Sequence, residues 1–150
     1  MRSRAACAFL GAAAVLAAGL DIAADEYGIT EIKKAEYRVG VKHRAEIAVG
    51  SRAYARLYVV AGSGWKVNVK FPFKVDVTAP AGVALEKSSL KKDDAKVLDD
   101  HKAVFKIPYT VSAAGSHELK AKVKLSVCQG TTQCLFPTET VEWTVSAKGE

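Results

Sequence analysis

The feature that most constrains the fold is a two-residue alternation of apolar and polar side chains, which recurs along most of the chain. Its longest example is residues 65–77, where every odd-numbered position is apolar. Successive side chains of a β-strand point to opposite faces of the sheet, so this run predicts a half-buried antiparallel strand or two collinear strands. Pro72 falls on the outward register and has no N–H to donate, which predicts a bulge or a sheet edge there.

Shorter alternating runs fill most of the remaining sequence, and small or turn-forming residues separate them. Residues 87–102 are the exception: they carry many charges and show no periodicity, so we expect an exposed loop there that could contain one helical turn. The sequence thus predicts about eight short strands and no amphipathic helix, which is typical of an all-β sandwich. The shorter runs are residues 39–49, 54–60, 83–85, 103–111, 119–127 and 141–145.

One domain is expected, because 150 residues are enough for one sizeable core and too few for two ordinary ones. The formal net charge of +6 would suit an anionic partner such as nucleic acid. However, the lysines recur singly on strand faces, and no basic run is interleaved with exposed aromatic residues. We therefore expect a solvated lysine face and no nucleic-acid partner.

Residues 1–24 have the composition of a secretory signal peptide. Arg2 and Arg4 form a short basic start, residues 5–20 are a continuous run of small apolar residues, and polar sequence follows. A membrane-spanning helix needs about 20 strongly apolar residues, whereas this run is shorter and rich in alanine. We therefore expect cleavage, after Ala24 or after Gly19, and no membrane insertion afterwards.

Cleavage would remove Cys7 and leave a mature domain, residues 25–150, that is periplasmic or secreted. This domain would keep Cys128 and Cys134, for which a disulfide is the default in an oxidising compartment.

These two cysteines lie six positions apart between two alternating runs, which predicts a β-hairpin with the disulfide across its mouth. In the run before them, apolar residues hold the odd-numbered positions, and Lys122 and Lys124 hold even-numbered ones. Cys128 shares the even parity. We therefore expect it on the lysine face, near the surface, and not among the apolar residues of the core.

Two roles for the disulfide remain open from spacing alone. As a staple, it would close a loop of roughly seven residues and stabilise the fold by about 2 kcal/mol. As an exchange-active disulfide, it would need an accessible sulfur and nearby positive charge, which Lys122 and Lys124 would supply. A bulge at Gln129-Gly130 would favour the staple, because it would flip the register and tuck the sulfurs under Trp143.

Other site chemistries find no support in the sequence. His43, His101 and His117 are scattered, and no spaced cluster of metal ligands is present. No histidine lies near either cysteine in the sequence, which argues against a blue-copper site. No carboxylate pair is placed for acid–base catalysis and no glycine-rich phosphate loop occurs, so we expect no metal, no cofactor and no hydrolase-type site.

The segment 128–140, CQGTTQCLFPTET, resembles the redox hairpin of the N-terminal periplasmic domain of DsbD-type thiol:disulfide interchange proteins. That hairpin has a pair of cysteines five residues apart, then an aromatic residue, a proline and a Glu-Thr start to the next strand. Phe136, Pro137 and Glu139 hold those positions here. Weaker similarity extends to residues 64–67, 81–83, 105–108 and 114–115.

The resemblance implies an immunoglobulin-like sandwich with a reversible Cys128–Cys134 disulfide. This disulfide would take electrons from a thioredoxin-like protein or domain and pass them to periplasmic thiol proteins. Either cysteine would form the mixed disulfide, and the other would resolve it. The alternative is a secreted binding or structural module in which the disulfide only holds the hairpin.

The sequence departs from the family in two respects. In the family an aromatic-containing cap loop shields the cysteines, and the matching stretch, residues 87–102, contains no aromatic residue. From the family's cap position we expect this stretch to lie over or beside the cysteine hairpin. The 150 residues also include neither a transmembrane electron channel nor a Cys-x-x-Cys thioredoxin module.

Overall fold

The computed structural model describes residues 27–149. The predicted signal peptide, its two cleavage positions and Cys7 lie outside these residues. Within residues 27–149 the chain is almost entirely β-structure, and no helix there is long and apolar enough to cross a membrane.

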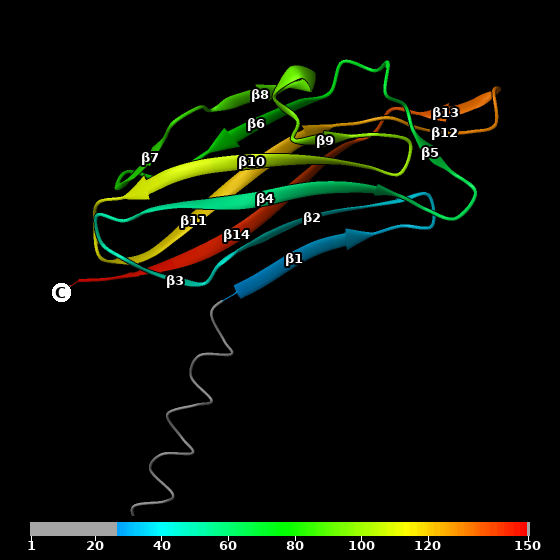
Figure 1. The fold of residues 1–150 in the computed structure, drawn as a ribbon. Coiled ribbons are helices and arrows are strands. Elements are labelled where there is room, and N and C mark those ends of the chain that lie inside the picture. The colour runs from blue at the N-terminus through cyan, green and yellow to red at the C-terminus, as the bar shows by residue number, and fades with distance from the viewer. Residues whose placement is uncertain (1–26, 150) are drawn as a thin grey trace, which may run out of the picture.

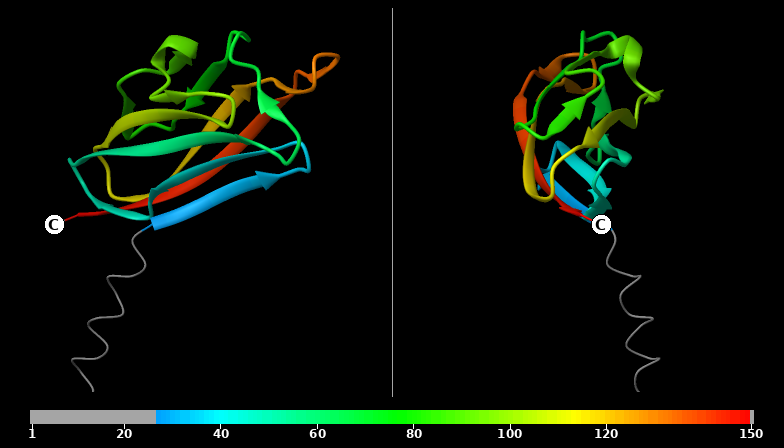
Figure 2. Two further views of the ribbon diagram at one scale, coloured as in Figure 1. Left: turned by 45° about the vertical axis from the view of Figure 1, so that its right-hand side comes forward. Right: turned by 90° about the vertical axis from the view of Figure 1, so that its left-hand side faces the viewer.

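Two sheets pack face to face, and a third, smaller sheet extends one end of the sandwich (Figure 1). The two further views separate the layers of the sandwich and show the small sheet projecting beyond them (Figure 2). The six-stranded sheet has the order β1-β2-β4-β10-β7, with β9 also pairing with β10. Its strands are β1 (Tyr27–Lys33), β2 (Tyr37–Arg44), β4 (Arg52–Ala61), β7 (Val83–Leu85), β9 (Val97–Leu98) and β10 (Lys102–Val111).

The five-stranded sheet forms the second layer, in the order β3-β14-β11-β6-β8. The three-stranded sheet has the order β13-β12-β5. Among the described strands every pairing is antiparallel except that of β3 with β14. The strands of these two sheets are β3 (Glu46–Ala48), β5 (Lys66–Val67), β6 (Lys74–Thr78), β8 (Ser89–Lys91), β11 (Gly115–Lys124), β12 (Val127–Gln129), β13 (Gln133–Leu135) and β14 (Thr138–Lys148).

The core lies between the two larger sheets and takes its side chains from one register of each strand. In β10, for example, residues 103, 105, 107, 109 and 111 are buried and the residues between them are not. Phe105 on β10 packs in one cluster with Leu57 of β4 and Leu119 of β11, and all three are fully buried. Burying each such side chain contributes about 1.5–3 kcal/mol. The predicted fold class, an all-β immunoglobulin-like sandwich, is confirmed.

The long alternating run 65–77 forms two strands in succession, β5 and β6, which pair with β12 and β11. Six residues, 68–73, join these strands, whereas only residues 125–126 separate β11 from β12. The longer connection, between β5 and β6, forms a turn in which the Phe71 N–H donates to the Asn68 carbonyl at 3.1 Å. Pro72 is exposed in this turn, so the interruption predicted from its missing N–H is present.

Residues 87–102 are more ordered than the loop that we expected. They contain β8, a 3₁₀ turn η3 (Lys92–Asp94) and β9. The helical turn agrees with the expectation, but the two strands were missed. Strands of two or three residues at a sheet edge are too short to show a period, and only Leu90 of β8 is buried.

Candidate functional site

The candidate site is the hairpin of β12 and β13, where Cys128 and Cys134 form the predicted disulfide. The two residues are directly opposite each other in the strand pairing, with their Cα atoms 4.0 Å apart. A three-residue loop, 130–132, joins the strands, and Gly130 has a φ of +64°. Glycine adopts this left-handed conformation without steric cost, which lets so short a loop close the hairpin.

The register of the small sheet divides its residues between two faces. Cys128 is opposite both Cys134 and Lys66, so these three side chains share one face. The neighbouring row is formed by Val67, Val127 and Leu135, which pack against the hydrophobic core from the other face. The predicted placement of Cys128 away from the apolar residues is therefore correct, but the lysine across from it is Lys66 and not Lys122 or Lys124.

Both cysteines are half-buried, and the residues of the tip, 129–133, are exposed. The pairing continues without a bulge from Cys128 to Gln129, which is opposite Gln133. Trp143 lies in the other layer, opposite Leu119 on β11. The alternative in which a register flip tucks the sulfurs under Trp143 is thus not the arrangement observed.

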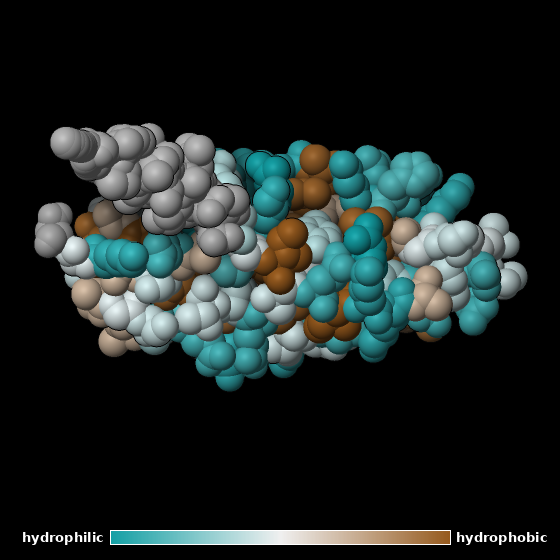
Figure 3. Space-filling model, turned by 90° about the horizontal axis from the view of Figure 1, so that it is seen from below, coloured by the Kyte–Doolittle hydropathy of each residue, from teal (hydrophilic) through white to brown (hydrophobic). Residues whose placement is uncertain are grey.

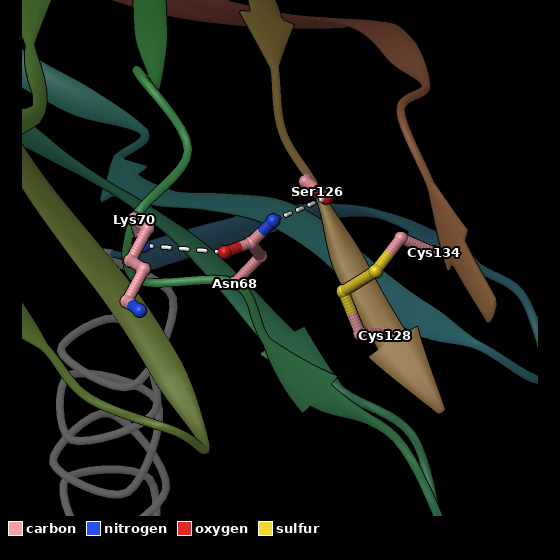
Figure 4. Close-up of a disulfide and its surroundings, with 5 residues drawn as sticks. All are labelled: Asn68, Lys70, Ser126, Cys128 and Cys134. Atoms are coloured by element: carbon pink, nitrogen blue, oxygen red, sulfur yellow. Dashed lines mark hydrogen bonds between the residues drawn. A yellow bond between two sulfur atoms is a disulfide. The ribbon is translucent and has the colours of Figure 1, made fainter. Parts of the chain in front are cut away.

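A pair of polar residues fixes the junction between β11 and β12 (Figure 4). The Asn68 backbone N–H donates to the Ser126 carbonyl at 3.0 Å, and Asn68 Nδ2 donates to Ser126 Oγ at 3.3 Å. Asn68 Oδ1 also accepts from the Lys70 N–H at 3.2 Å. Ser126 is fully buried, so these bonds satisfy groups that water does not reach. Sequence reasoning missed this pair, although a serine in the lysine register was a visible signal.

The structure brings Lys66, and not the two predicted lysines, into register with the disulfide. Lys122 and Lys124 lie on β11 in the five-stranded sheet, opposite Thr140 and Thr138 of β14. Along an extended chain Lys124 is four positions, or about 13 Å, from Cys128. Lys66 lies directly across from Cys128, and its Nζ is 3.9 Å from Asp100 Oδ2.

Phe136 and Pro137 follow Cys134 and line the side of the hairpin that faces β2. The Phe136 side chain is 63% exposed, and its ring lies 5.6 Å from that of Phe71. The Pro137 carbonyl accepts from the Leu125 N–H at 3.2 Å, which closes the β11–β14 ladder just before the hairpin. An open pocket with Leu135, Phe136 and Pro137 on one side has Tyr37 on the other.

Glu139, the other residue of the family-like segment, belongs to a partly buried polar cluster beside this pocket. The Tyr37 hydroxyl donates to the Glu139 carboxylate, and Lys34 Nζ is 2.9 Å from Glu139 Oε2. Burial alone would raise the pKa of the Glu139 carboxyl, but the hydrogen bonds from Tyr37 and Lys34 outweigh it and lower the pKa. Burial and the carboxylate together raise the pKa of Tyr37.

The expectation that residues 87–102 lie beside the hairpin holds only for their last part. The Val67 N–H of β5 donates to the Asp100 carbonyl at 2.8 Å. His101 also shares an open groove with Gly130 and Thr131 of the hairpin loop. The earlier part, β8, pairs with β6 instead.

Among residues 27–149 no group of three or more His, Cys, Asp or Glu side chains is placed to hold a metal ion. The functional group at this site is thus the Cys128–Cys134 disulfide, with Lys66 opposite Cys128.

No family model matches this chain, and no curated protein does. Solved structures with similar folds include the C-terminal part of alpha-2-macroglobulin from Escherichia coli, with 15% identity and a TM-score of 0.48. That match covers 77% of this chain and 17% of the macroglobulin chain. The GAE domain of GGA2p from Saccharomyces cerevisiae matches with 12% identity and a TM-score of 0.46, over 79% of this chain and 97% of that one.

A conjugative transposon lipoprotein from Bacteroides eggerthii matches with 10% identity and a TM-score of 0.31, over 77% of this chain and 95% of that one. At these identities and TM-scores the similarities assign neither a family nor an activity.

Proposed function

We propose that this protein is an exported domain whose Cys128–Cys134 disulfide exchanges with the thiols of a thioredoxin-like partner, in the periplasm or outside the cell. The observation that carries the proposal is the position of the disulfide. It lies on the outward face of a small sheet beyond the sandwich, across from Lys66 and outside the hydrophobic core.

The partner enters the exchange as a reduced dithiol. A thiolate of the partner attacks one sulfur of Cys128–Cys134, forms a mixed disulfide and expels the other cysteine as a thiolate. The second thiol of the partner then attacks the mixed disulfide, leaving the partner oxidised and both cysteines reduced. Two electrons and two protons pass in total, and the reduced domain passes them to a further disulfide by the reverse steps.

Lys66 supports this chemistry as the cation directly opposite Cys128 in the strand pairing. A positive charge nearby favours the thiolate over the thiol, which speeds both departure and re-attack. Asp100 Oδ2 lies 3.9 Å from Lys66 Nζ at the exposed surface. Because this carboxylate partly offsets the positive charge, Lys66 stabilises the thiolate only modestly. The resemblance of residues 128–140 to the DsbD-type redox hairpin supports the same reaction and the same compartment.

A second candidate, a secreted binding or structural module with a permanent disulfide, has one observation in its favour. Val67, Val127 and Leu135 on the inner face of the hairpin pack against the end of the core. A staple that kept these residues in place would need no exchange at all.

The deciding measurement is the reduction potential of the native disulfide, followed by its rate of reduction by a thioredoxin. We expect a potential above about −300 mV and reduction under native conditions, because structural disulfides lie below that value. Lys66→Glu should slow reduction by up to about fivefold, since an exposed charge contributes about 1 kcal/mol or less. The matched control, Lys122→Glu with Lys124→Glu, should change the rate less because both lysines lie in another sheet.

A disulfide that a thioredoxin reduces only in denaturant would contradict the proposal and leave the stapled module as the better function. A larger effect of the β11 variant than of Lys66→Glu would keep the exchange but remove Lys66 from it.

A further inference from the structure

The outer face of the six-stranded sheet carries a row of cations contributed by three neighbouring strands. Lys42 of β2 is directly opposite Arg56 of β4, and Arg56 is directly opposite Lys106 of β10. Neighbouring strands are about 4.8 Å apart, so the three side chains stand side by side on one face. Ile29 of β1 is opposite Lys42 and extends the row to the sheet edge.

The cations of this row lack the carboxylate partners that Lys120 and Lys148 have in the five-stranded sheet. Like charges directly opposite each other destabilise a sheet. In the five-stranded sheet, Lys120 pairs with Glu142 at 3.7 Å and Lys148 with Glu46 at 3.3 Å. Among the described residues no carboxylate forms an ion pair with Lys42, Arg56 or Lys106.

Glu86, whose carboxylate interacts with Lys106 at longer range, is itself hydrogen-bonded to Arg52, with Arg52 Nη2 and Glu86 Oε1 2.9 Å apart. The row of three cations therefore keeps its charge available to an external anion.

Exposed aromatic and aliphatic side chains flank the cations. Tyr27, Ile29 and Tyr54 are 58%, 64% and 44% exposed. Lys42 Nζ lies 5.4 Å from the centre of the Tyr27 ring, and Lys106 Nζ lies 4.0 Å from that of Tyr54. A cavity of about 210 Å³ between the two tyrosines is lined by both rings and by Lys42 and Arg56.

We call this surface the basic–aromatic face; its members are Tyr27, Ile29, Lys42, Tyr54, Arg56 and Lys106. The sequence predicts a solvated lysine face because no basic run contains exposed aromatics. The strand register overturns that premise by assembling cations and tyrosines from four strands. Seen from below, in the part that the grey atoms leave visible, apolar side chains form small separate patches among hydrophilic ones (Figure 3).

We propose that the basic–aromatic face docks the protein peripherally on an anionic phospholipid bilayer. Lysine and arginine near such a surface interact favourably with anionic headgroups, and their long side chains can reach the phosphates. Tyrosine is favoured at the headgroup level, where its ring is buried and its hydroxyl is hydrated. Ile29 supplies the aliphatic side chain that enters the acyl boundary.

A soluble polyanion fits this face less well than a bilayer does. Proteins that bind single-stranded nucleic acid combine a positive groove that follows the backbone with aromatic rings for stacking. Here the row runs across a sheet, and its outermost member is an exposed isoleucine, which has no counterpart in a phosphate or sulfate polymer. The proposed docking is independent of the disulfide, which lies on a different sheet.

The experiment is flotation of the full chain with vesicles of phosphatidylglycerol and phosphatidylcholine, and with vesicles of phosphatidylcholine alone. Neutral vesicles measure the apolar contribution of residues 1–26. The charge contribution of Arg2 and Arg4 appears only with anionic vesicles, and it is common to all variants. We expect binding to the anionic vesicles that weakens as salt rises. Lys42→Gln, Arg56→Gln and Lys106→Gln together should weaken it about 100-fold, since each such residue contributes about a fivefold factor.

The matched control is Lys120→Gln, Lys122→Gln and Lys124→Gln on β11, which removes the same charge from the opposite layer. It should weaken binding by less than about threefold. Ile29→Ser should weaken vesicle binding about fivefold and leave binding to heparin, a soluble polyanion, unchanged. Because Ile29 is exposed, this variant should fold, which thermal melting would verify.

Three results would overturn the proposal: equal losses for the two triple variants, tight binding to heparin with none to anionic vesicles, or no effect of Ile29→Ser on vesicle binding. The first would mean attraction by net charge alone, and the second and third would mean a soluble polyanion as the ligand.

Discussion

Phe105 and Phe136 are both aromatic, but Phe105 at the centre of β10 is fully buried, whereas Phe136 beside the cysteine hairpin is 63% exposed. Phe105 belongs to a cluster to which both large sheets contribute, while Phe136 contacts the ring of Phe71 at the surface. The sandwich is therefore held by the burial of apolar area from two layers. The hairpin has one apolar face, and its outward face is held by a covalent bond.

This difference would allow one chain to combine a stable scaffold with the exchange-active disulfide that we propose. Regions with few buried contacts open locally at low free-energy cost, whereas central strands open only with global unfolding. The hairpin is joined to the sandwich by the partly buried Asn68–Ser126 hydrogen bonds and by its inner apolar row. Chemistry at the disulfide can thus proceed while the sandwich stays folded.

The largest expected effect comes from truncating the two phenylalanines. Phe105→Ala should lower the free energy of unfolding by about 3–5 kcal/mol, because it leaves a cavity between the sheets. Phe136→Ala should change it by less than about 0.5 kcal/mol. Urea denaturation of both variants measures the difference, and similar losses would show that the hairpin is part of the cooperative core.

A smaller effect is expected from removing the disulfide. Cys128→Ser with Cys134→Ser should still fold cooperatively and lose about 2 kcal/mol, the value for closing a loop of roughly seven residues. Hydrogen exchange should speed up at the amides of Gln129 and Gln133 and stay slow at that of Phe105. Thermal melts without a cooperative transition would mean that the fold depends on the disulfide, in favour of the structural role.

The smallest expected effect is on the pH dependence of the stability of the sandwich. Burial lowers the pKa of His43 below its ordinary 6.5, and the hydrogen bond to the Arg44 carbonyl only partly offsets this. As the pH falls below about 7, the unfolded chain takes up a proton at His43 that the folded chain does not bind. His43 therefore makes stability fall with pH until the pH reaches its lowered pKa in the folded chain. The carboxylates with lowered pKa, such as Glu139, titrate below this window.

His43→Gln should therefore flatten the fall in the urea midpoint over this pH range, while His101→Gln, at an exposed position, should leave it unchanged. If both variants changed the pH dependence of the urea midpoint equally, that dependence would not come from the buried His43.

Local features of the site were predictable because they depend mainly on the backbone period. The odd-numbered register of residues 103–111 faces the core, and Cys128 lies away from the core, as its parity predicted. Parity alone was not sufficient, because Ser126 in the same register is fully buried. The turn at Pro72 follows from its missing N–H. Strand β1 gave no signal, because its inward positions include the small residues Gly28 and Thr30, which interrupt any apolar alternation.

By itself, then, the sequence determined the strand periodicity, the cysteine hairpin and the face on which Cys128 lies. Only the tertiary structure decided that Lys66 is the lysine beside Cys128, and that Lys42, Arg56 and Lys106 stand in one row. The direction of a side chain is set within its own strand. Which distant residues become its neighbours depends on strand order and register, and those are fixed only when the two sheets bury their apolar faces together.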